Sequence, residues 1–229
     1  MSAGKNEPVE AAGIRVKVST DGPYLVSGGA PLIEMAIVND EQGVPYAWKK
    51  GKRYPAREAC ALCRCGRSAK KPFCDGTHIK VKFDGTEALS RPFGKGAEVF
   101  EGPSLKLIDD RAFCARARYC HRGEGIWKLT EHSHDPKARR QAIEISGNCP
   151  AGRLVLKDQG TGKEIEPELE EAIGLVEDPH RQEEGPLWVM GGIQIEGAGG
   201  FLYQRRNRVT LCRCGRSGNK PFCDGSHSD

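Results

Sequence analysis

The chain has 229 residues, with 35 Lys and Arg against 31 Asp and Glu and a formal net charge of +4. This balance does not indicate a nucleic-acid-binding protein, and no apolar run reaches the roughly 18 residues of a membrane span. Because the first residues also lack an apolar run of signal-peptide length, we expect a cytoplasmic protein with no membrane partner. In that compartment, ten cysteines are more typical of metal ligands than of disulfides.

Residues 12–100 are expected to form the first of two small β-rich modules. Short apolar runs broken by Gly and Pro predict strands over residues 14–18, 24–26 and 32–38. Asp75 is expected to cap a short helix, and the alternation of apolar and basic residues over 79–83 predicts one more strand. Four potential metal ligands with the spacing C-x-C-x8-C-x3-H lie in this module: Cys63, Cys65, Cys74 and His78.

Residues 101–180 are expected to form a separate small α+β domain. Apolar runs predict strands over residues 105–109 and 153–157. Between them, Asp135 and Pro136 supply the N-cap and first-turn proline of a helix that should end near residue 147. Cys114 and Cys120 precede this helix, and Cys149 follows it directly.

Residues 181–229 are expected to form the second β-rich module, with a strand over residues 187–190. The ligand spacing of the first module recurs here without insertion or deletion, and residues 62–78 differ from residues 211–227 at only positions 69, 70 and 77. This conservation of spacing within one chain indicates two equivalent metal sites. The ligands of the second site are Cys212, Cys214, Cys223 and His227.

Three thiols and one imidazole suit zinc or an iron–sulfur cluster, and they do not suit calcium or magnesium. Structural zinc usually takes ligand pairs two to four residues apart, so the C-x-C spacing favours iron–sulfur and leaves zinc as the alternative. Cys60 would add a C-x2-C pair to the first site. Its counterpart in the second copy is Val209, so we interpret Cys60 as a packing residue of a strand.

The doubled motif resembles the signature of the CDGSH iron–sulfur domains, the NEET family, with Ser68, Ser217, Pro72 and Pro221 in the family's Ser/Thr and Pro positions. The resemblance implies one 2Fe–2S cluster per motif, held by three Cys and the Nδ1 atom of one His. Domains of this family generally pair as homodimers with exchanged strands. We therefore expect a mainly β fold in which the two modules form an intramolecular pseudo-dimer, and a monomeric protein.

The middle region resembles a single-cluster bacterial ferredoxin, whose usual pattern is C-x2-C-x2-C followed later by C-P. Ala117 occupies the position of the second cysteine. Three interpretations stay open: a 3Fe–4S cluster on the three cysteines Cys114, Cys120 and Cys149, a cluster with a fourth ligand such as His121, or a ferredoxin fold without metal.

The sequence predicts an electron-transfer or cluster-transfer protein in which His78 and His227 make cluster binding sensitive to pH. Its partners would be redox proteins or cluster acceptors, with no nucleic acid among them. Two alternatives are a zinc-stabilised interaction module and an enzyme component whose middle domain passes electrons to a catalytic partner. No catalytic motif is present, so we expect no enzymatic activity. The basic runs at residues 49–53 and 205–208 are interpreted as solvated strand ends.

Overall fold

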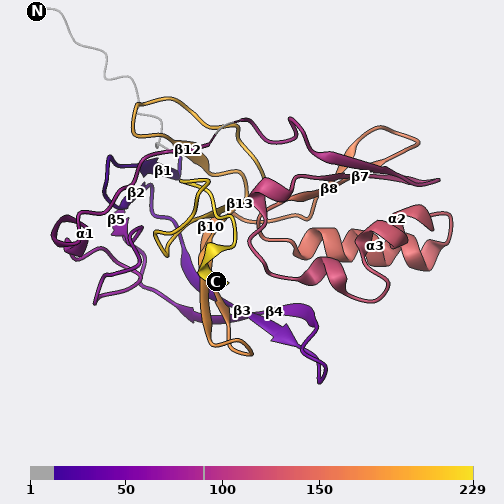
Figure 1. The fold of residues 1–229 in the computed structure, drawn as a ribbon, viewed down its shortest axis with the longest axis horizontal. Helices are drawn as coiled ribbons and strands as arrows, with labels where there is room; N and C mark the ends of the chain where they lie inside the picture. The colour runs from indigo at the N-terminus through magenta and orange to yellow at the C-terminus, as the bar shows by residue number, and fades with distance from the viewer. Residues whose placement is uncertain (1–12, 90, 229) are drawn as a thin grey trace, which may run out of the picture.

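The computed structural model describes residues 13–89 and 91–228, and over these residues the fold is mainly β, with three small sheets and short helices (Figure 1). Residues 1–12, 90 and 229 lie outside the described residues. The expectation of a cytoplasmic protein rests on residues 1–12. Residues 12 and 229 are also the outer limits that were expected for the two modules. Within the described part, none of the helices is long and apolar enough to cross a membrane.

The first sheet combines strands from both ends of the chain, in the order β12-β1-β2-β5. Strand β1 pairs antiparallel with β2, which pairs antiparallel with β5. On its other edge β1 pairs in parallel with β12, with Val16 opposite Ile195. The strands are β1 (Arg15–Val18), β2 (Tyr24–Ser27), β5 (Ala59–Leu62) and β12 (Gln194–Glu196).

The second sheet repeats this arrangement with the roles of the modules exchanged, in the order β13-β11-β10-β3-β4. Strand β10 pairs antiparallel with β11 and in parallel with β3, with Ile173 opposite Leu32. Strand β4 is an additional edge strand. The strands are β3 (Leu32–Asn39), β4 (Pro45–Arg53), β10 (Ala172–Asp178), β11 (Glu183–Met190) and β13 (Arg208–Leu211).

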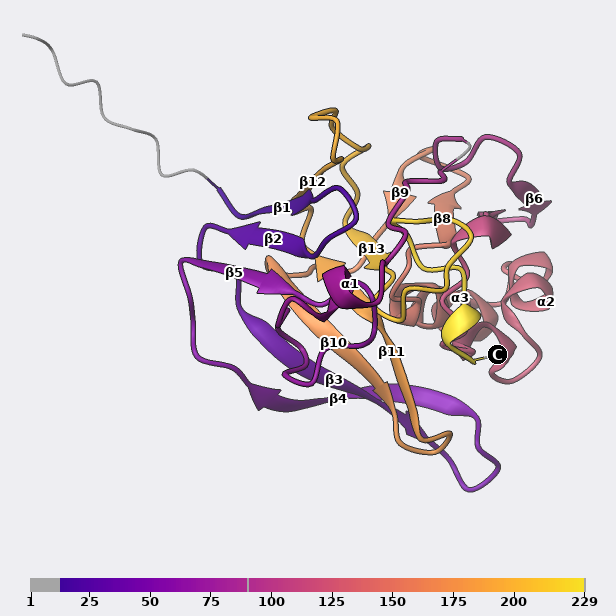
Figure 2. The same ribbon diagram turned by 60° about the vertical axis from the view of Figure 1, so that its left-hand side comes forward.

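Each module therefore gives one strand to the sheet of the other, β3 in one direction and β12 in the other (Figure 2). Strand β10 lies within the range expected for the middle domain, yet it is the counterpart of β1. The alternating burial of β1 and β2 directs Val16, Tyr24 and Val26 into a core that also contains Leu187 and Val189 of the second module. Both modules share this one core, as the expected pseudo-dimer requires.

Direct backbone contact between the two C-x-C loops strengthens the pairing. A Cβ atom on Gly66 would lie 2.6 Å from the carbonyl oxygen of Cys214, and one on Gly215 would lie 2.7 Å from that of Cys65. Both glycines have positive φ, +74° and +80°, where other residues are strained. The buried Tyr24 crosses the same boundary, because its hydroxyl donates to the carbonyl oxygen of Cys212 at 2.7 Å.

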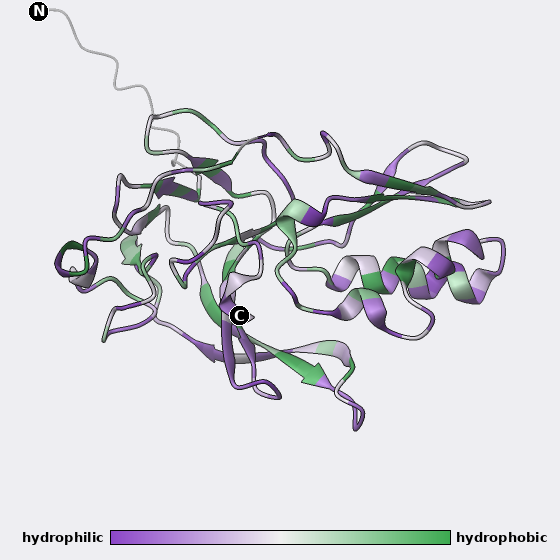
Figure 3. Cartoon of the chain, viewed as in Figure 1, coloured by the Kyte–Doolittle hydropathy of each residue, from purple (hydrophilic) through white to green (hydrophobic). Residues whose placement is uncertain are grey.

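The middle segment is a four-stranded antiparallel sheet, β6-β7-β8-β9, against which two helices pack. Strands β7 and β8 combine a hydrophobic stretch with hydrophilic positions, and the helices also carry residues of both kinds (Figure 3). Asp135 caps α3 as predicted, accepting hydrogen bonds from the N–H groups of Lys137 and Ala138. The elements are β6 (Glu98–Glu101), β7 (Leu105–Asp109), α2 (Ile126–Glu131), α3 (Pro136–Asn148), β8 (Leu154–Asp158) and β9 (Glu164–Ile165).

The conformation of residues 79–83 and the exposure of Arg208 differ from the predictions. Residues 79–83 do not form a strand, because the chain enters the helix α1 (Thr77–Lys80) directly after Gly76 and then turns. In the basic run 205–208, Arg208 is buried rather than solvated. Its guanidinium pairs with Glu166 at 2.5 Å and donates to the carbonyl oxygen of Cys149 at 3.0 Å, so it fastens β13 to the middle segment.

The glycine contact between the C-x-C loops can be tested by substitution. Gly66→Ala and Gly215→Ala should each destabilise the protein by about 1–3 kcal/mol, because the added methyl group overlaps a backbone carbonyl that cannot move freely. Gly162→Ala is the matched control, since Gly162 also has positive φ (+70°) but no atom within 4 Å of its Cβ position. Thermal melting of the three variants should show a larger loss for the first two, and equal losses would contradict the contact.

Candidate metal centres

The structure brings the four predicted ligands of the first site together as two pairs. The Sγ atoms of Cys63 and Cys65 are 3.8 Å apart, and the Sγ of Cys74 is 3.3 Å from the Nδ1 of His78. Two backbone hydrogen bonds hold the pairs beside each other: the N–H of Cys63 donates to the carbonyl oxygen of Pro72, and that of Cys74 to the carbonyl oxygen of Ala61.

The second site has the same construction. The Sγ atoms of Cys212 and Cys214 are 3.7 Å apart, and the Sγ of Cys223 is 3.5 Å from the Nδ1 of His227. The N–H of Cys212 donates to the carbonyl oxygen of Pro221 at 2.8 Å, which repeats the bond from Cys63. The two copies therefore fold alike at all eight donors.

These separations fit metal ligation. A tetrahedral metal with bonds of about 2.3 Å to sulfur and about 2.0 Å to nitrogen places two thiolates about 3.8 Å apart, and a thiolate and an imidazole nitrogen about 3.5 Å apart. Each Cys–Cys pair and each Cys–His pair can thus hold one metal. Among the residues that the structure describes, no three His, Cys, Asp or Glu side chains are placed to hold a single ion.

Backbone N–H groups donate to sulfur atoms in both sites. In the first site the N–H of Arg67 lies 3.5 Å from the Sγ of Cys65, and the N–H of Gly76 lies 3.5 Å from the Sγ of Cys74. Equivalent donors serve Cys214 and Cys223 in the second site. Such donors favour the charged thiolate, which is the metal-binding form.

In the second site the thiols also act on each other. A hydrogen bond from Cys212 and the N–H of Arg216 lower the pKa of Cys214 to about 6, although burial opposes this shift. The same bond and burial raise the pKa of Cys212. Burial, reinforced by three arginine side chains, lowers the pKa of His227, which keeps its imidazole neutral and able to bind metal.

Asp75 shapes the loop that carries the first site. Its carboxylate accepts hydrogen bonds from the N–H groups of Ala69 and Thr77, at 2.8 and 3.0 Å. Hydrogen bonds from these two residues hold the pKa of Asp75 well below its usual range. The prediction that Asp75 caps this helix was wrong, because Gly76 is the N-cap.

The arginines of the C-x-C loops are not solvated. Arg64 is 1% exposed and donates to the carbonyl oxygens of Ser19 and Gly85. Arg213 is also buried and donates to the carbonyl oxygen of Val176 and to Glu177, both at 2.7 Å. Both side chains anchor the loops to neighbouring backbone.

Cys60 lies in β5, opposite Val26, and packs against the shared core. Burial raises the pKa of its thiol. Val209 is buried at the equivalent position of β13. The structure thus agrees with the interpretation of Cys60 as a packing residue.

The middle segment brings its three cysteines together. Cys114, Cys120 and Cys149 line one small cavity, with Ala117 at the position where the ferredoxin pattern has a cysteine. Burial, followed by the charge of Cys149, raises the pKa of Cys120 to about 12. The fourth ligand considered from the sequence, His121, does not line the cavity; its ring lies 5.5 Å from that of Trp127.

A buried ion pair next to this cavity was not recognised from the sequence. Arg153 donates to the Sγ of Cys114 at 3.0 Å and forms two hydrogen bonds with the carboxylate of Asp109. Trp127 donates to the same carboxylate at 3.0 Å. The sequence does contain a sign of this ion pair. Asp109 ends one predicted strand and Arg153 begins the other, and antiparallel pairing of these strands brings the two residues close together.

The second site and the middle segment are in contact. Cys223 packs against Ala115, Ala151 and Cys149. A Cβ atom on Gly225 would lie 2.6 Å from the side chain of Arg116, and the amide of Asn219 donates to the carbonyl oxygen of Ala112 at 3.0 Å. The loop that follows β7 therefore covers the second site.

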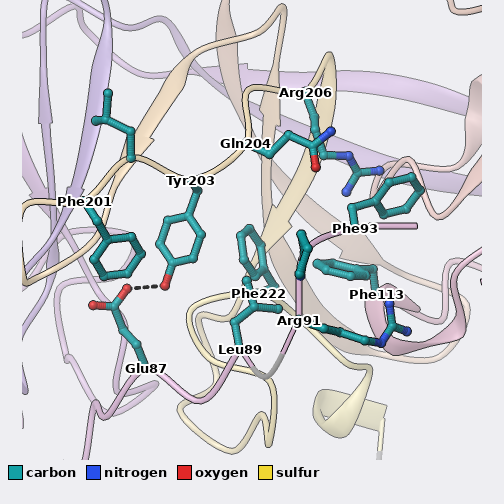
Figure 4. A pocket seen from close by; sticks show the side chains of 12 residues that line it. Glu87, Leu89, Arg91, Phe93, Phe113, Phe201, Tyr203, Gln204, Arg206 and Phe222 are labelled. Atoms are coloured by element: carbon teal, nitrogen blue, oxygen red, sulfur yellow. Dashed lines mark hydrogen bonds between the residues drawn. The ribbon is translucent and has the colours of Figure 1, made fainter. Parts of the chain in front are cut away.

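A row of five aromatic rings fixes this contact (Figure 4). Neighbouring ring centroids lie 4.8 to 5.6 Å apart along the order Phe93, Phe113, Phe222, Tyr203 and Phe201. Phe113 directly precedes Cys114, and Phe222 directly precedes Cys223. Because their rings pack at 5.3 Å, the row holds the middle cavity and the second site at a fixed separation.

Comparisons with protein families agree with this geometry. The family model described as iron-binding zinc finger CDGSH type matches residues 21–79 and 184–228, and the model described as divergent 4Fe-4S mono-cluster matches residues 100–159. Comparisons with curated proteins and with solved structures returned no significant match. All eight paired donors lie within the first two matches, and the three cysteines of the middle cavity lie within the third. The chain therefore carries two CDGSH-type iron-binding domains on either side of a divergent 4Fe-4S mono-cluster segment.

Proposed function

We propose that each CDGSH site holds a 2Fe–2S cluster and that the protein acts in electron transfer or cluster transfer. The observation that carries this proposal is the arrangement of each donor set as two pairs with chelating separations. A diiron cluster uses two such pairs, one on each iron, whereas a zinc ion gathers all four donors around one centre. When bound, the cluster supplies a group that takes up and releases one electron.

The surrounding residues support an anionic centre of this kind. Backbone N–H groups donate to sulfur in both sites, and the buried Arg64 and Arg213 rigidify the loops that carry the ligands. Because one ligand of each site is a neutral imidazole, the site is less negative than one with four thiolates. Replacing Cys by His raises the reduction potential in other 2Fe–2S centres, and we expect the same direction here.

The middle segment is the second part of the proposal. Its three cysteines line one cavity, and the buried Arg153 places a positive charge beside Cys114. We propose that Cys114, Cys120 and Cys149 hold a third iron–sulfur cluster. A zinc-stabilised module remains the alternative function for the whole chain, and analysis of the metal separates the two.

The metal content gives the first test. The purified protein should be coloured and contain about four irons and four sulfides from the two CDGSH sites, with an additional amount from the middle segment. Cys63→Ser with Cys65→Ser should remove about two irons, and Cys114→Ser should remove only the additional amount. Cys60→Ser is the control and should keep the full content. A colourless protein that contains zinc and no iron would contradict the proposal.

The histidine ligands should make the clusters sensitive to acid, because protons compete with the metal for the imidazole. His227→Cys should lower the reduction potential of the second cluster and slow its loss in acid. We expect that loss below the usual pKa of His, about 6.5, because burial lowers the pKa of His227. Redox titrations followed by EPR at several pH values measure both effects, with the first cluster as an internal reference. An unchanged pH dependence at the second site would count against His227 as a ligand.

The oligomeric state follows from the strand exchange. Since β3 and β12 already pair across the two modules within one chain, we propose that the protein is a monomer. Light scattering of the iron-loaded protein should give the mass of one chain over a tenfold dilution series. A stable mass of two chains would contradict this proposal.

A further inference from the structure

A cavity of about 670 Å³ lies between the second sheet and the middle segment, and none of the predicted metal ligands lines it. Trp188 and Met190 of β11 form part of its wall. The alternating residues Leu187 and Val189 belong to the shared core, so the cavity lies on the opposite face of the sheet. The facing wall is formed by α3 and by the chain from β9 onward, with residues 143, 144, 147, 148 and 165–170. The volume is within the range of small-molecule sites, about 300–1,000 Å³.

Hydrogen bonds fix the positions of both walls. The indole N–H of Trp48, which lines the cavity from β4, donates to the carbonyl oxygen of Asn148 at the end of α3, at 3.1 Å. On the other side, the amide of Asn207 donates to the carbonyl oxygen of Pro167 at 2.8 Å. The cavity is therefore preformed, and a ligand would not have to order its walls on binding.

The wall on the side of the sheet suits an aromatic ligand. The rings of Trp48 and Trp188 lie with their centroids 5.0 Å apart and are tilted by 42°. Met35 and Met190 line the cavity beside them. Aromatic rings gain from offset or tilted contacts with other rings, and thioether sulfur gains from contact with ring edges. A flat aromatic compound is therefore favoured here over a saturated compound of the same size.

The charges of the lining favour an uncharged ligand. None of the charged side chains that line the cavity is fully buried. The carboxylate of Glu144 already forms an ion pair with Arg122, and that of Glu166 forms one with the buried Arg208. The other charged side chains of the lining are exposed and include both signs: Lys50, Glu168 and Glu170. Because no unpaired buried charge would offset an ionic group on the ligand, burying such a group here would be costly.

We propose that this cavity is the binding site of a small uncharged aromatic compound. The inference goes beyond the proposed function, because binding here does not require a metal. The site is nevertheless next to the middle cysteines: Asn148 directly precedes Cys149, and the ring of Trp48 lies 5.2 Å from that of Tyr119, which directly precedes Cys120. A bound compound would thus contact neighbours of two of the three middle cysteines.

Binding of matched probes tests the proposal. The full-length protein is titrated by calorimetry at neutral pH with 1-naphthol, with the anionic 1-naphthalenesulfonate, with the cationic form of 1-naphthylmethylamine, and with the saturated decahydro-1-naphthol. The uncharged aromatic probe, 1-naphthol, should bind about tenfold more tightly than each of the other three.

A variant that fills the cavity locates the bound probe. Gly147 lines the cavity, and its Cβ position is 3.9 Å from the nearest atoms, which belong to Pro167, so a side chain can enter there. Gly147→Leu should weaken the binding of 1-naphthol about tenfold or more and should keep the fold, because Leu is a better helix former than Gly. Arg140→Leu, at an exposed position of the same helix outside the cavity lining, is the matched control and should change the affinity less than about twofold.

Ala172→Leu fills the cavity from the side of the sheet and gives a second, independent variant. Thermal melting and iron content are measured on each variant, so that a misfolded protein is not mistaken for a filled cavity. Three outcomes would overturn the site: no binding of 1-naphthol, equal or tighter binding of a charged or saturated probe, or full binding by either filled variant in a folded state. Specific binding of 1-naphthol to a protein without iron would refute the proposed function and keep the site, and full iron content without binding would do the reverse.

Discussion

The exchange of strands between the two modules is the constraint on which the rest of the structure depends. Each module is too small to bury a large core alone, and the parallel pairs β1–β12 and β3–β10 merge the two into one. The exchange also brings the C-x-C loops into backbone contact, which leaves room only for glycine at positions 66 and 215. The geometry of each metal site is consequently tied to the folding of the other module.

The middle segment breaks the symmetry that this exchange creates. Its sheet and helices form a separate core, and its cysteine loops lie against the second site. Arg208 and the row of aromatic rings stabilise the contact between the middle segment and the second module. Two motifs with almost identical sequences therefore have different surroundings. One of the three positions at which the motifs differ contacts the covering loop: it is Lys70 in the first copy and Asn219 in the second.

The ligand pattern and the internal pairing of the modules could be predicted from the sequence, whereas several strand partners and local conformations could not. Fixed spacing selected the eight donors that the structure brings together in pairs, since a repeated chelate pattern requires one geometry. Comparison of the copies assigned Cys60 to packing, and the family resemblance implied the internal pairing. The partner of β10 is set by contacts far along the chain, so its place in the module sheet was missed. Residues 79–83 alternate as a strand does, but in the described structure the chain enters the helix α1 after Gly76 and then turns.

Covering the second site carries an electrostatic cost that its neighbours offset. Removing water from an anionic metal site disfavours its negative charge, as the burial of Cys223 and its raised pKa show. The covering loop brings Arg116 to the site, and Arg213 and Arg216 add positive charge from the motif itself. The arginine in the covering loop thus offsets part of the cost of burying the second site, together with the two arginines of the motif itself.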